Sequence, residues 1–175
     1  MFGTALFAWK SSSSRAPAAN RAIGAQSSGE APAKPDSAAF YEASLPDLDG
    51  RTIAFRDYLG RPTVVNFWAT WCAPCKAEMP TLDALAASEK GRMNVIAVSQ
   101  DLEGRAPVFA FFKETAVKNL VPYTDADNAL LTAFNNAIAL PTTILYDSDG
   151  KEVWRVAGSV EWDEAEMAKL LRAAD

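Results

Sequence analysis

Two cysteines lie between a segment typical of a buried strand and a segment typical of an amphipathic helix. Cys72 and Cys75 are the only cysteines of the 175-residue chain. Residues 63–69 are rich in β-branched and aromatic side chains, a pattern that favours a buried strand. The apolar residues that recur after the cysteines at helical spacing are Met79, Leu82, Leu85 and Ala86. A helix is therefore expected from about residue 73, with Cys72 at its N-terminus.

The position of Cys72 gives its thiol a chemical role. Unpaired backbone N–H groups and the helix dipole favour an anion at a helix N-terminus. Activated cysteines in such places have a pKa of ~3.5–7.5, against ~8.5 for an unperturbed thiol. We expect Cys72 to attack a disulfide of a partner, and Cys75 to resolve the mixed disulfide. Between them, Ala73 and Pro74 shape the donors around the thiolate, and Pro74 suits the first helical turn.

The absence of histidine removes several other kinds of site. A structural zinc site needs about four Cys or His ligands, and this chain offers two. Attachment of a c-type haem needs His directly after the second cysteine, where Lys76 stands. A redox dithiol, a metal site shared between two chains and two inert thiols remain as interpretations, and the first is favoured. No metal and no cofactor are expected, because the chain also lacks a glycine-rich dinucleotide fingerprint.

Composition predicts one folded domain preceded by a tail. Apolar residues make up 49% of the chain and charged residues 22%, which is typical of a globular core. The net charge of −5, without a long basic block, argues against nucleic acid as a partner. Residues 1–36 read as a flexible tail or linker, and residues 37–175 as the domain. The apolar stretch at residues 1–9 is too short to span a bilayer, and it is either the remnant of a signal-anchor or part of a disordered tail.

The remaining pattern is that of an α/β fold with a mixed sheet. Strands are expected at residues 52–55, 63–69, 94–99, 121–124, 142–146 and 152–156. Helical segments are expected at residues 57–60, from 73 onward, and at 106–118, 128–134 and 163–174. Asn128 or Asp127 is the expected N-cap of the fourth of these segments, and Asp163 lies near the start of the last.

The segment from Asn66 to Pro80, NFWATWCAPCKAEMP, resembles the active-site segment of TlpA/ResA-type thioredoxin-like proteins. The likeness runs from about residue 44 to the C-terminus, and residues 157–162 are most similar to the TlpA branch. It implies a thioredoxin fold, whose central mixed sheet is flanked by helices, with an N-terminal extension and a central αβ insertion at residues 101–124. It also implies a thiol-disulfide oxidoreductase that reduces partner proteins in cytochrome c maturation or in copper-centre assembly of cytochrome oxidase.

The same resemblance implies a place and partners. The expected setting is extracytoplasmic, in the periplasm or cell envelope, with a membrane tether through the N-terminus; a cytoplasmic setting is the alternative. Clients would be disulfide-bearing proteins, electrons would come from a membrane donor of thiol type, and the protein would be a monomer. Two other functions stay open: a thiol peroxidase, which needs threonine where Ala69 stands, and a non-catalytic thioredoxin-fold adaptor.

Several residues near the dithiol acquire expected roles from this resemblance. Pro141 matches a cis-proline that faces the dithiol, and would hold Leu140 extended so that its backbone pairs with a client peptide. The alternative is an ordinary proline at a strand start. Trp71 is expected on the client-binding surface, together with Ala73, Pro74 and Leu140. Trp68 is expected in the core.

Proton handling is assigned to Glu78, three residues after Cys75 on the same helix face. Thioredoxin has a buried aspartate six residues before its first cysteine, where this chain has Asn66, which cannot act as a base. A carboxylate at Glu78 could take up the proton of Cys75. The alternative is a solvated acid on the helix surface.

Overall fold

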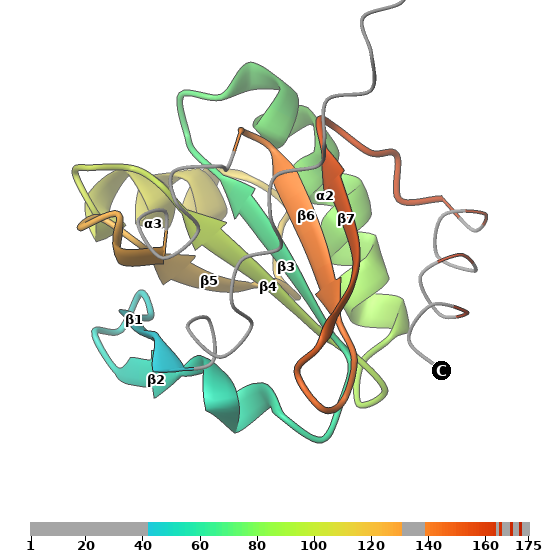
Figure 1. The fold of residues 1–175 in the computed structure, drawn as a ribbon. Helices are drawn as coiled ribbons and strands as arrows, with labels where there is room; N and C mark the ends of the chain where they lie inside the picture. The colour runs from blue at the N-terminus through green and yellow to red at the C-terminus, as the bar shows by residue number, and fades with distance from the viewer. Residues whose placement is uncertain (1–41, 131–138, 164, 166–168, 170–171, 173–175) are drawn as a thin grey trace, which may run out of the picture. The chain divides into compact units, whose positions relative to one another are not determined.

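The computed structural model describes residues 42–130 and 139–163, together with residues 165, 169 and 172. All of these belong to a compact unit that spans Pro32–Asp175. Its centre is a five-stranded sheet in the order β5-β4-β3-β6-β7 (Figure 1). The strands are β3 (Thr63–Trp68), β4 (Asn94–Ser99), β5 (Val121–Thr124), β6 (Thr142–Tyr146) and β7 (Glu152–Ala157). The expected α/β architecture with a mixed sheet is confirmed.

The strand directions place the two cysteines and the start of β6 at the same end of the sheet. Strand β3 pairs in parallel with β4, and β4 in parallel with β5, whereas β6 runs antiparallel to both β3 and β7. Parallel strands have their C-terminal ends at the same end of the sheet. Strands β3 and β4 therefore both finish at that end, where the helix that follows each strand begins (Figure 1). Strand β6 starts at that end of the sheet, because Thr142 lies opposite Phe67 in the register.

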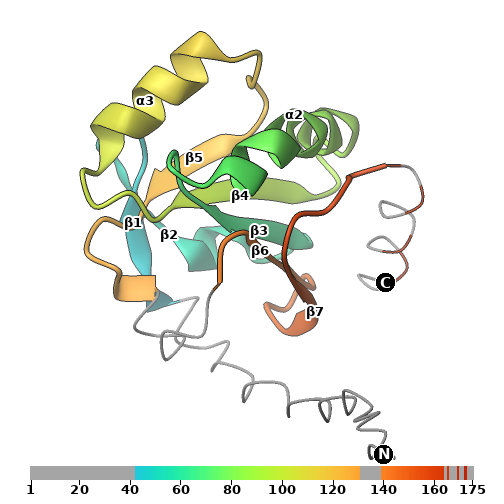
Figure 2. The same ribbon diagram turned by 90° about the horizontal axis from the view of Figure 1, so that it is seen from above.

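The two faces of the sheet build two apolar clusters. Alternate residues of a strand point to opposite faces, so Val64 and Trp68 lie in one cluster while Val65 and Phe67 lie in the other. Helix α2 (Ala73–Ser88) supplies Cys75, Met79, Leu82 and Leu85 to the first cluster. Helix α3 (Arg105–Glu114) covers the same face, as Figure 2 shows.

The predicted insertion at residues 101–124 contains α3 and β5. It forms the edge of the sheet, because β5 pairs with β4 alone among the five strands. Helix α3 is shorter than the helix expected over residues 106–118. Its prediction was wrong at the C-terminal end, because the carboxylate of Asp83 on α2 accepts the backbone N–H groups of Lys118, Asn119 and Leu120 at 2.9, 2.6 and 3.0 Å. A distant side chain thus captures donors that a continuing helix would have used internally.

The segment before β3 differs in detail from its prediction. A hairpin joins β1 (Ser44–Pro46) to β2 (Thr52–Ala54), and the first of these strands was not foreseen. Strand β2 ends one residue early because Phe55 opens the 3₁₀ turn η1 (Phe55–Tyr58). The Phe55 ring is buried against Tyr58 and Tyr123, and this packing decides the boundary.

Two expected helices lie mainly outside the described residues. Residues 129 and 130 are helical, and Leu130 N–H donates to a carboxylate oxygen of Asp125 at 3.3 Å, while residues 131–134 are not described. In the last segment, residues 165, 169 and 172 are helical, and Asp163 accepts from Ala165 N–H at 3.0 Å. Within the part of the chain that is described, none of the helices has the length and apolarity to cross a membrane.

Candidate active site

The dithiol lies after the C-terminal end of β3, at the start of α2. Cys72 is the N-cap of α2, and a disulfide joins it to Cys75 with the Cα atoms 5.3 Å apart. Cys72 is 6% exposed and Cys75 is 0% exposed. Cys72 therefore keeps a small exposed area, whereas Cys75 is fully buried between α2 and the sheet.

The start of α2 favours charge on the first sulfur. The backbone N–H of Cys75 donates to Cys72 Sγ at 3.3 Å. Pro74 occupies the first turn, where its lack of an N–H leaves no hydrogen bond unmade. Once the disulfide is reduced, the same N–H and the helix dipole stabilise a thiolate at Sγ of Cys72.

The Leu140–Pro141 peptide bond is cis, as the family resemblance implied. Pro141 directly precedes β6, whose first residues lie beside the C-terminal end of β3. The proline therefore lies at the same end of the sheet as the dithiol. Its carbonyl oxygen accepts the N–H of Gly158 at 2.8 Å. Leu140 is partly buried and packs on both apolar clusters.

Glu78 is not a solvated helix acid, because it is only 4% exposed. Its carboxylate accepts Asn66 Nδ2–H at 2.7 Å and the N–H of Val160 at 3.0 Å. Asn66 also donates to Thr143 Oγ1 at 2.9 Å. Burial raises the pKa of Glu78, and this outweighs the lowering by the bonds from Val160 and Asn66. The site therefore holds a buried carboxyl that keeps its proton to higher pH than an ordinary glutamate.

The contact between Asn66 and Glu78 is the feature that the sequence analysis missed. From the sequence, Asn66 was expected only as a position without a base, and Glu78 as a proton acceptor for Cys75 or a solvated acid. The two residues are twelve positions apart, and only the packing of α2 on β3 brings them together. No local sequence signal marks that pair.

The two tryptophans near the dithiol occupy opposite environments. Trp68 is fully buried, and its ring centroid lies 4.9 Å from that of Phe111 and 5.9 Å from that of Phe112. Its expected core position is confirmed. Trp71 directly precedes Cys72 and is 67% exposed. This exposure supports its assignment to the client-binding surface.

A loop after β7 closes one side of the site. Ser159 Oγ donates to the carbonyl of Pro74 at 3.2 Å, and the backbone N–H of Val160 donates to the carboxylate of Glu78 at 3.0 Å. Between this loop and α2 lies a hollow of about 490 Å³. Its lining residues are Ala77, Glu78, Thr81, Ser159, Val160, Glu161, Trp162 and Asp163. Glu78 therefore lines the hollow between α2 and this loop.

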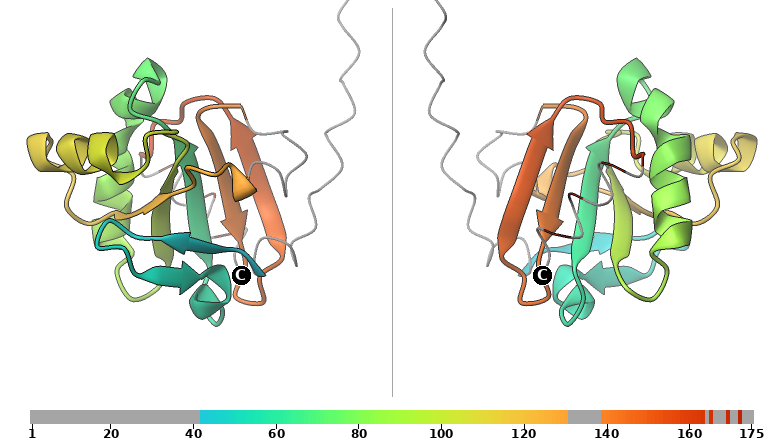
Figure 3. Two further views of the ribbon diagram at one scale, coloured as in Figure 1. Left: turned by 90° about the vertical axis from the view of Figure 1, so that its left-hand side faces the viewer. Right: turned by 90° about the vertical axis from the view of Figure 1, so that its right-hand side faces the viewer.

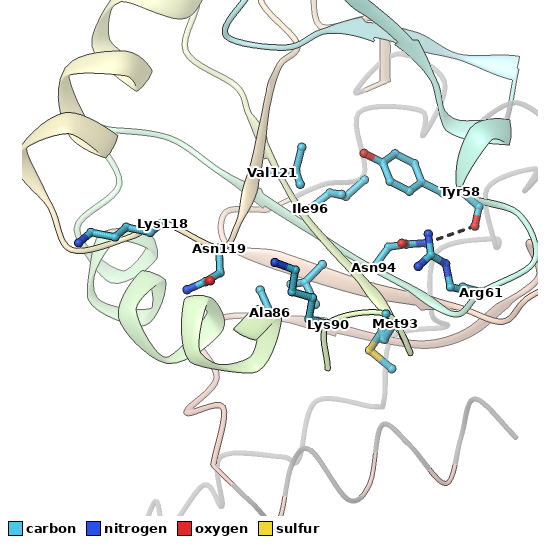
Figure 4. A pocket seen from close by; sticks show the side chains of 12 residues that line it. Tyr58, Arg61, Ala86, Lys90, Met93, Asn94, Ile96, Lys118, Asn119 and Val121 are labelled. Carbon is cyan, nitrogen blue, oxygen red and sulfur yellow. Dashed lines mark hydrogen bonds between the residues drawn. The ribbon is translucent and has the colours of Figure 1, made fainter. Parts of the chain in front are cut away.

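A second hollow, of about 290 Å³, plays no part in this chemistry (Figure 4). It is lined by Lys90 beyond the C-terminal end of α2 and by Asn94 at the start of β4. Both lie at the end of the sheet opposite the dithiol, and the lining has no cysteine or carboxylate. Among the described residues, no group of three or more Cys, Asp or Glu is placed to hold a metal ion.

Comparison with known proteins identifies the family. The model of the Redoxin family matches residues 12–171. This chain belongs to the Redoxin family. It is 34% identical to the thiol-disulfide oxidoreductase ResA of Bacillus thuringiensis subsp. konkukian over 122 residues, which is 69% of this chain and 68% of that protein. ResA of Bacillus subtilis is also 34% identical, over 117 residues, or 66% and 64% of the two chains.

Solved structures show that this Redoxin-family protein has a thioredoxin-like fold. DsbF of MTB matches it with a TM-score of 0.68 and 26% identity, over 77% of this chain and 97% of that one. The pneumococcal exposed lipoprotein thioredoxin Etrx1 of Streptococcus pneumoniae matches with a TM-score of 0.64 and 28% identity, over 74% and 98%.

These relationships and the geometry agree on the activity. The Redoxin-family protein is a ResA-type thiol-disulfide oxidoreductase that acts on disulfide-bearing client proteins. Its redox centre is the pair of Cys72 and Cys75. Ala69 occupies the position where a peroxidase of this fold needs threonine, and it serves instead as a backbone acceptor for Cys72 N–H at 3.1 Å.

Proposed function

We propose that this protein is an extracytoplasmic reductase of client disulfides, with clients in cytochrome c maturation or in copper-centre assembly of cytochrome oxidase. The observation that carries the proposal is the asymmetry of the dithiol, with Cys72 reachable at the start of α2 and Cys75 sealed beneath it. The 34% identity to ResA supports the client class. The name of the exposed lipoprotein thioredoxin Etrx1 supports a tethered position outside the cytoplasm.

The proposed exchange has two steps that balance in atoms and electrons. The Cys72 thiolate attacks a sulfur of the client disulfide, that S–S bond breaks, and a mixed disulfide forms. The Cys75 thiolate then attacks Cys72 Sγ, which closes the intramolecular disulfide and releases the client as a dithiol. Two electrons and two protons pass to the client, and a thiol donor at the membrane restores the reduced pair.

The surrounding residues divide the work of this exchange. Cis-Pro141 would hold the backbone of Leu140 open to the client peptide at the edge of the sheet. Glu78 would accept the proton that Cys75 must lose before it attacks, since it lies one helical turn further along α2. Residues 1–36 would form the linker to the tether and residues 37–175 the working domain, which would act as a monomer.

A reductase requires a low reduction potential, and equilibration with a glutathione redox buffer measures it. We expect a value near that of thioredoxin, about −270 mV, since the client must be left reduced. The ratio of free to bonded Cys72 and Cys75, read after acid quenching and thiol alkylation, gives the potential. A value near that of DsbA, about −120 mV, would mean that the protein oxidises its clients, and the proposal would be wrong.

Replacing Glu78 by glutamine is expected to change two pH profiles. The pKa of Glu78 is raised above its ordinary value of 4.5, so its contribution to stability is complete below that value and is lost as the pH rises through the folded-state pKa. In Glu78→Gln this loss disappears, and the free energy of unfolding relative to the unchanged protein should rise with pH above about 4.5. The Cys75 thiol of the reduced variant should titrate at lower pH, since a neighbouring negative charge is removed.

The matched control is Glu161→Gln, an exposed acid on the loop that closes the site. Urea denaturation at a series of pH values and alkylation of Cys75 in a Cys72→Ser background give the two profiles. Profiles of Glu78→Gln that coincide with those of the unchanged protein would remove the proposed proton role.

A further inference from the structure

The loops that enter the three parallel strands each bring a basic residue to the same end of the sheet. Arg61 precedes β3, Lys90 precedes β4 and Lys118 precedes β5. Parallel strands start at the same end of a sheet, so these loops meet at the end away from the dithiol (Figures 1 and 3). All three side chains line the second hollow, of about 290 Å³.

The second hollow is cationic, although the chain as a whole is acidic. The chain has a net charge of −5, yet the lining of this hollow contains no Asp or Glu. In the part of the chain that the structure describes, none of the three basic residues of the lining forms an ion pair. Arg92 and Arg155, by contrast, pair with carboxylates at 3.0 and 2.8 Å. The protein therefore leaves the positive charge of the hollow without a counter-charge of its own.

The two carboxylates next to the hollow are engaged elsewhere. Asp83 accepts the backbone N–H groups of Lys118 and Asn119, and also the side-chain amide of Asn119 at 2.8 Å. Glu89 directly precedes Lys90, but its carboxylate pairs with Arg92 at 3.0 Å. These contacts hold the loops before β4 and β5 in place. The lining is thus formed by the fold itself, as is usual for a small-molecule site.

The donors of the hollow suit a phosphate group. Arginine and lysine carry several N–H donors and no acceptor, and both are common phosphate ligands. Figure 4 shows Lys90 and Arg61 on opposite sides of Met93, with Lys118 extending outward. A phosphate group presents several acceptor oxygens with its negative charge, so it can meet basic residues from two loops at once. The volume lies near the lower limit of ligand pockets, about 300 Å³, which suits a small anionic group.

We propose that the second hollow binds a phosphate group, with Lys90 and Arg61 as its main ligands and Lys118 at its outer rim. A free phosphate compound and the headgroup of an anionic phospholipid both present this group. The site is separate from the dithiol and takes no part in the exchange of electrons with the client. Binding to a headgroup would leave the dithiol facing away from the bilayer.

Titration of the full chain with inorganic phosphate, followed by phosphorus NMR, measures binding. Lys90→Gln and Arg61→Gln should each weaken it roughly tenfold, because a hydrogen bond to a charged group is lost. The matched controls are Lys113→Gln and Arg105→Gln, which remove the same charge from exposed positions on α3, outside the hollow. The controls should bind as the unchanged protein does. Melting temperatures of the four variants check that all are folded.

Co-sedimentation with vesicles distinguishes the two sources of the phosphate. Vesicles of phosphatidylglycerol mixed with phosphatidylcholine are compared with vesicles of phosphatidylcholine alone. Binding to the anionic vesicles that Lys90→Gln weakens and inorganic phosphate displaces assigns the site to a headgroup. Binding of inorganic phosphate without binding of vesicles assigns it to a free phosphate compound. The inference is wrong if the unchanged protein binds neither probe, if Lys90→Gln leaves binding unaltered, or if the controls on α3 weaken it equally.

Discussion

Replacing Cys72 by serine is expected to abolish the reduction of protein disulfides. A hydroxyl at the N-cap of α2 is not deprotonated at neutral pH and cannot form a mixed disulfide, whereas the Cys72 thiol benefits from the helix terminus and from the Cys75 N–H. Cys75 cannot substitute for it, because it is fully buried. Insulin reduction in the presence of dithiothreitol, followed by turbidity, measures the loss. Full activity in Cys72→Ser would show that the nucleophile has been assigned wrongly.

The reciprocal variant, Cys75→Ser, separates the two steps of the exchange. It retains the attacking thiol and loses the resolving one, so it should accumulate a mixed disulfide with the client peptide and turn over only once. Mass spectrometry of the quenched reaction detects this adduct. If Cys75→Ser turned over many times without an external thiol, the sealed cysteine would have no resolving role.

Replacing Trp68 by alanine should cost about 3–5 kcal/mol of unfolding free energy. The side chain is fully buried at the end of β3, and its ring packs on Phe111 and Phe112 of α3. Its removal leaves a cavity between the sheet and the insertion helix. Domains of this size have a total stability of about 5–15 kcal/mol, so the loss is a large fraction of it. Urea denaturation followed by circular dichroism gives the difference.

Phe109→Ala is the control for this experiment. Phe109 lies on α3, like the Phe111 and Phe112 that Trp68 contacts, but it is half exposed. It should change the unfolding free energy by no more than about 0.5 kcal/mol. Equal destabilisation by the two substitutions would show that α3 does not depend on Trp68 for its position. The predicted role of Trp68 in the core would then need revision.

The features predicted best were those with strong local signals. The apolar run before Cys72 became β3, and the periodic residues after it became the buried face of α2. Strands β4, β5 and β6 were placed with their correct limits, because β-branched segments bounded by turns leave few alternatives. The cis form of the bond before Pro141 was expected from the family resemblance alone.

The errors occurred where a distant residue decides a local conformation. Helix α3 ends at Glu114 because the Asp83 carboxylate on another helix binds the backbone of residues 118–120. Strand β2 ends at Ala54 because the Phe55 ring enters an aromatic cluster with Tyr123, which is far along the chain. Propensity and periodicity describe neighbours in sequence, and these contacts are between residues far apart in it.

The sequence by itself determined the chemistry of this protein. Two cysteines with two residues between them, a strand before them, a helix after them and no histidine leave a redox dithiol as the favoured interpretation. Only the tertiary structure decided which sulfur is reachable, since burial of Cys75 depends on how α2 packs on the sheet. The same packing decided between the two expectations for Glu78, which is buried against Asn66 and is not a solvated acid. Local spacing sets which groups react, whereas exposure and proton affinity depend on neighbours that only the folded chain supplies.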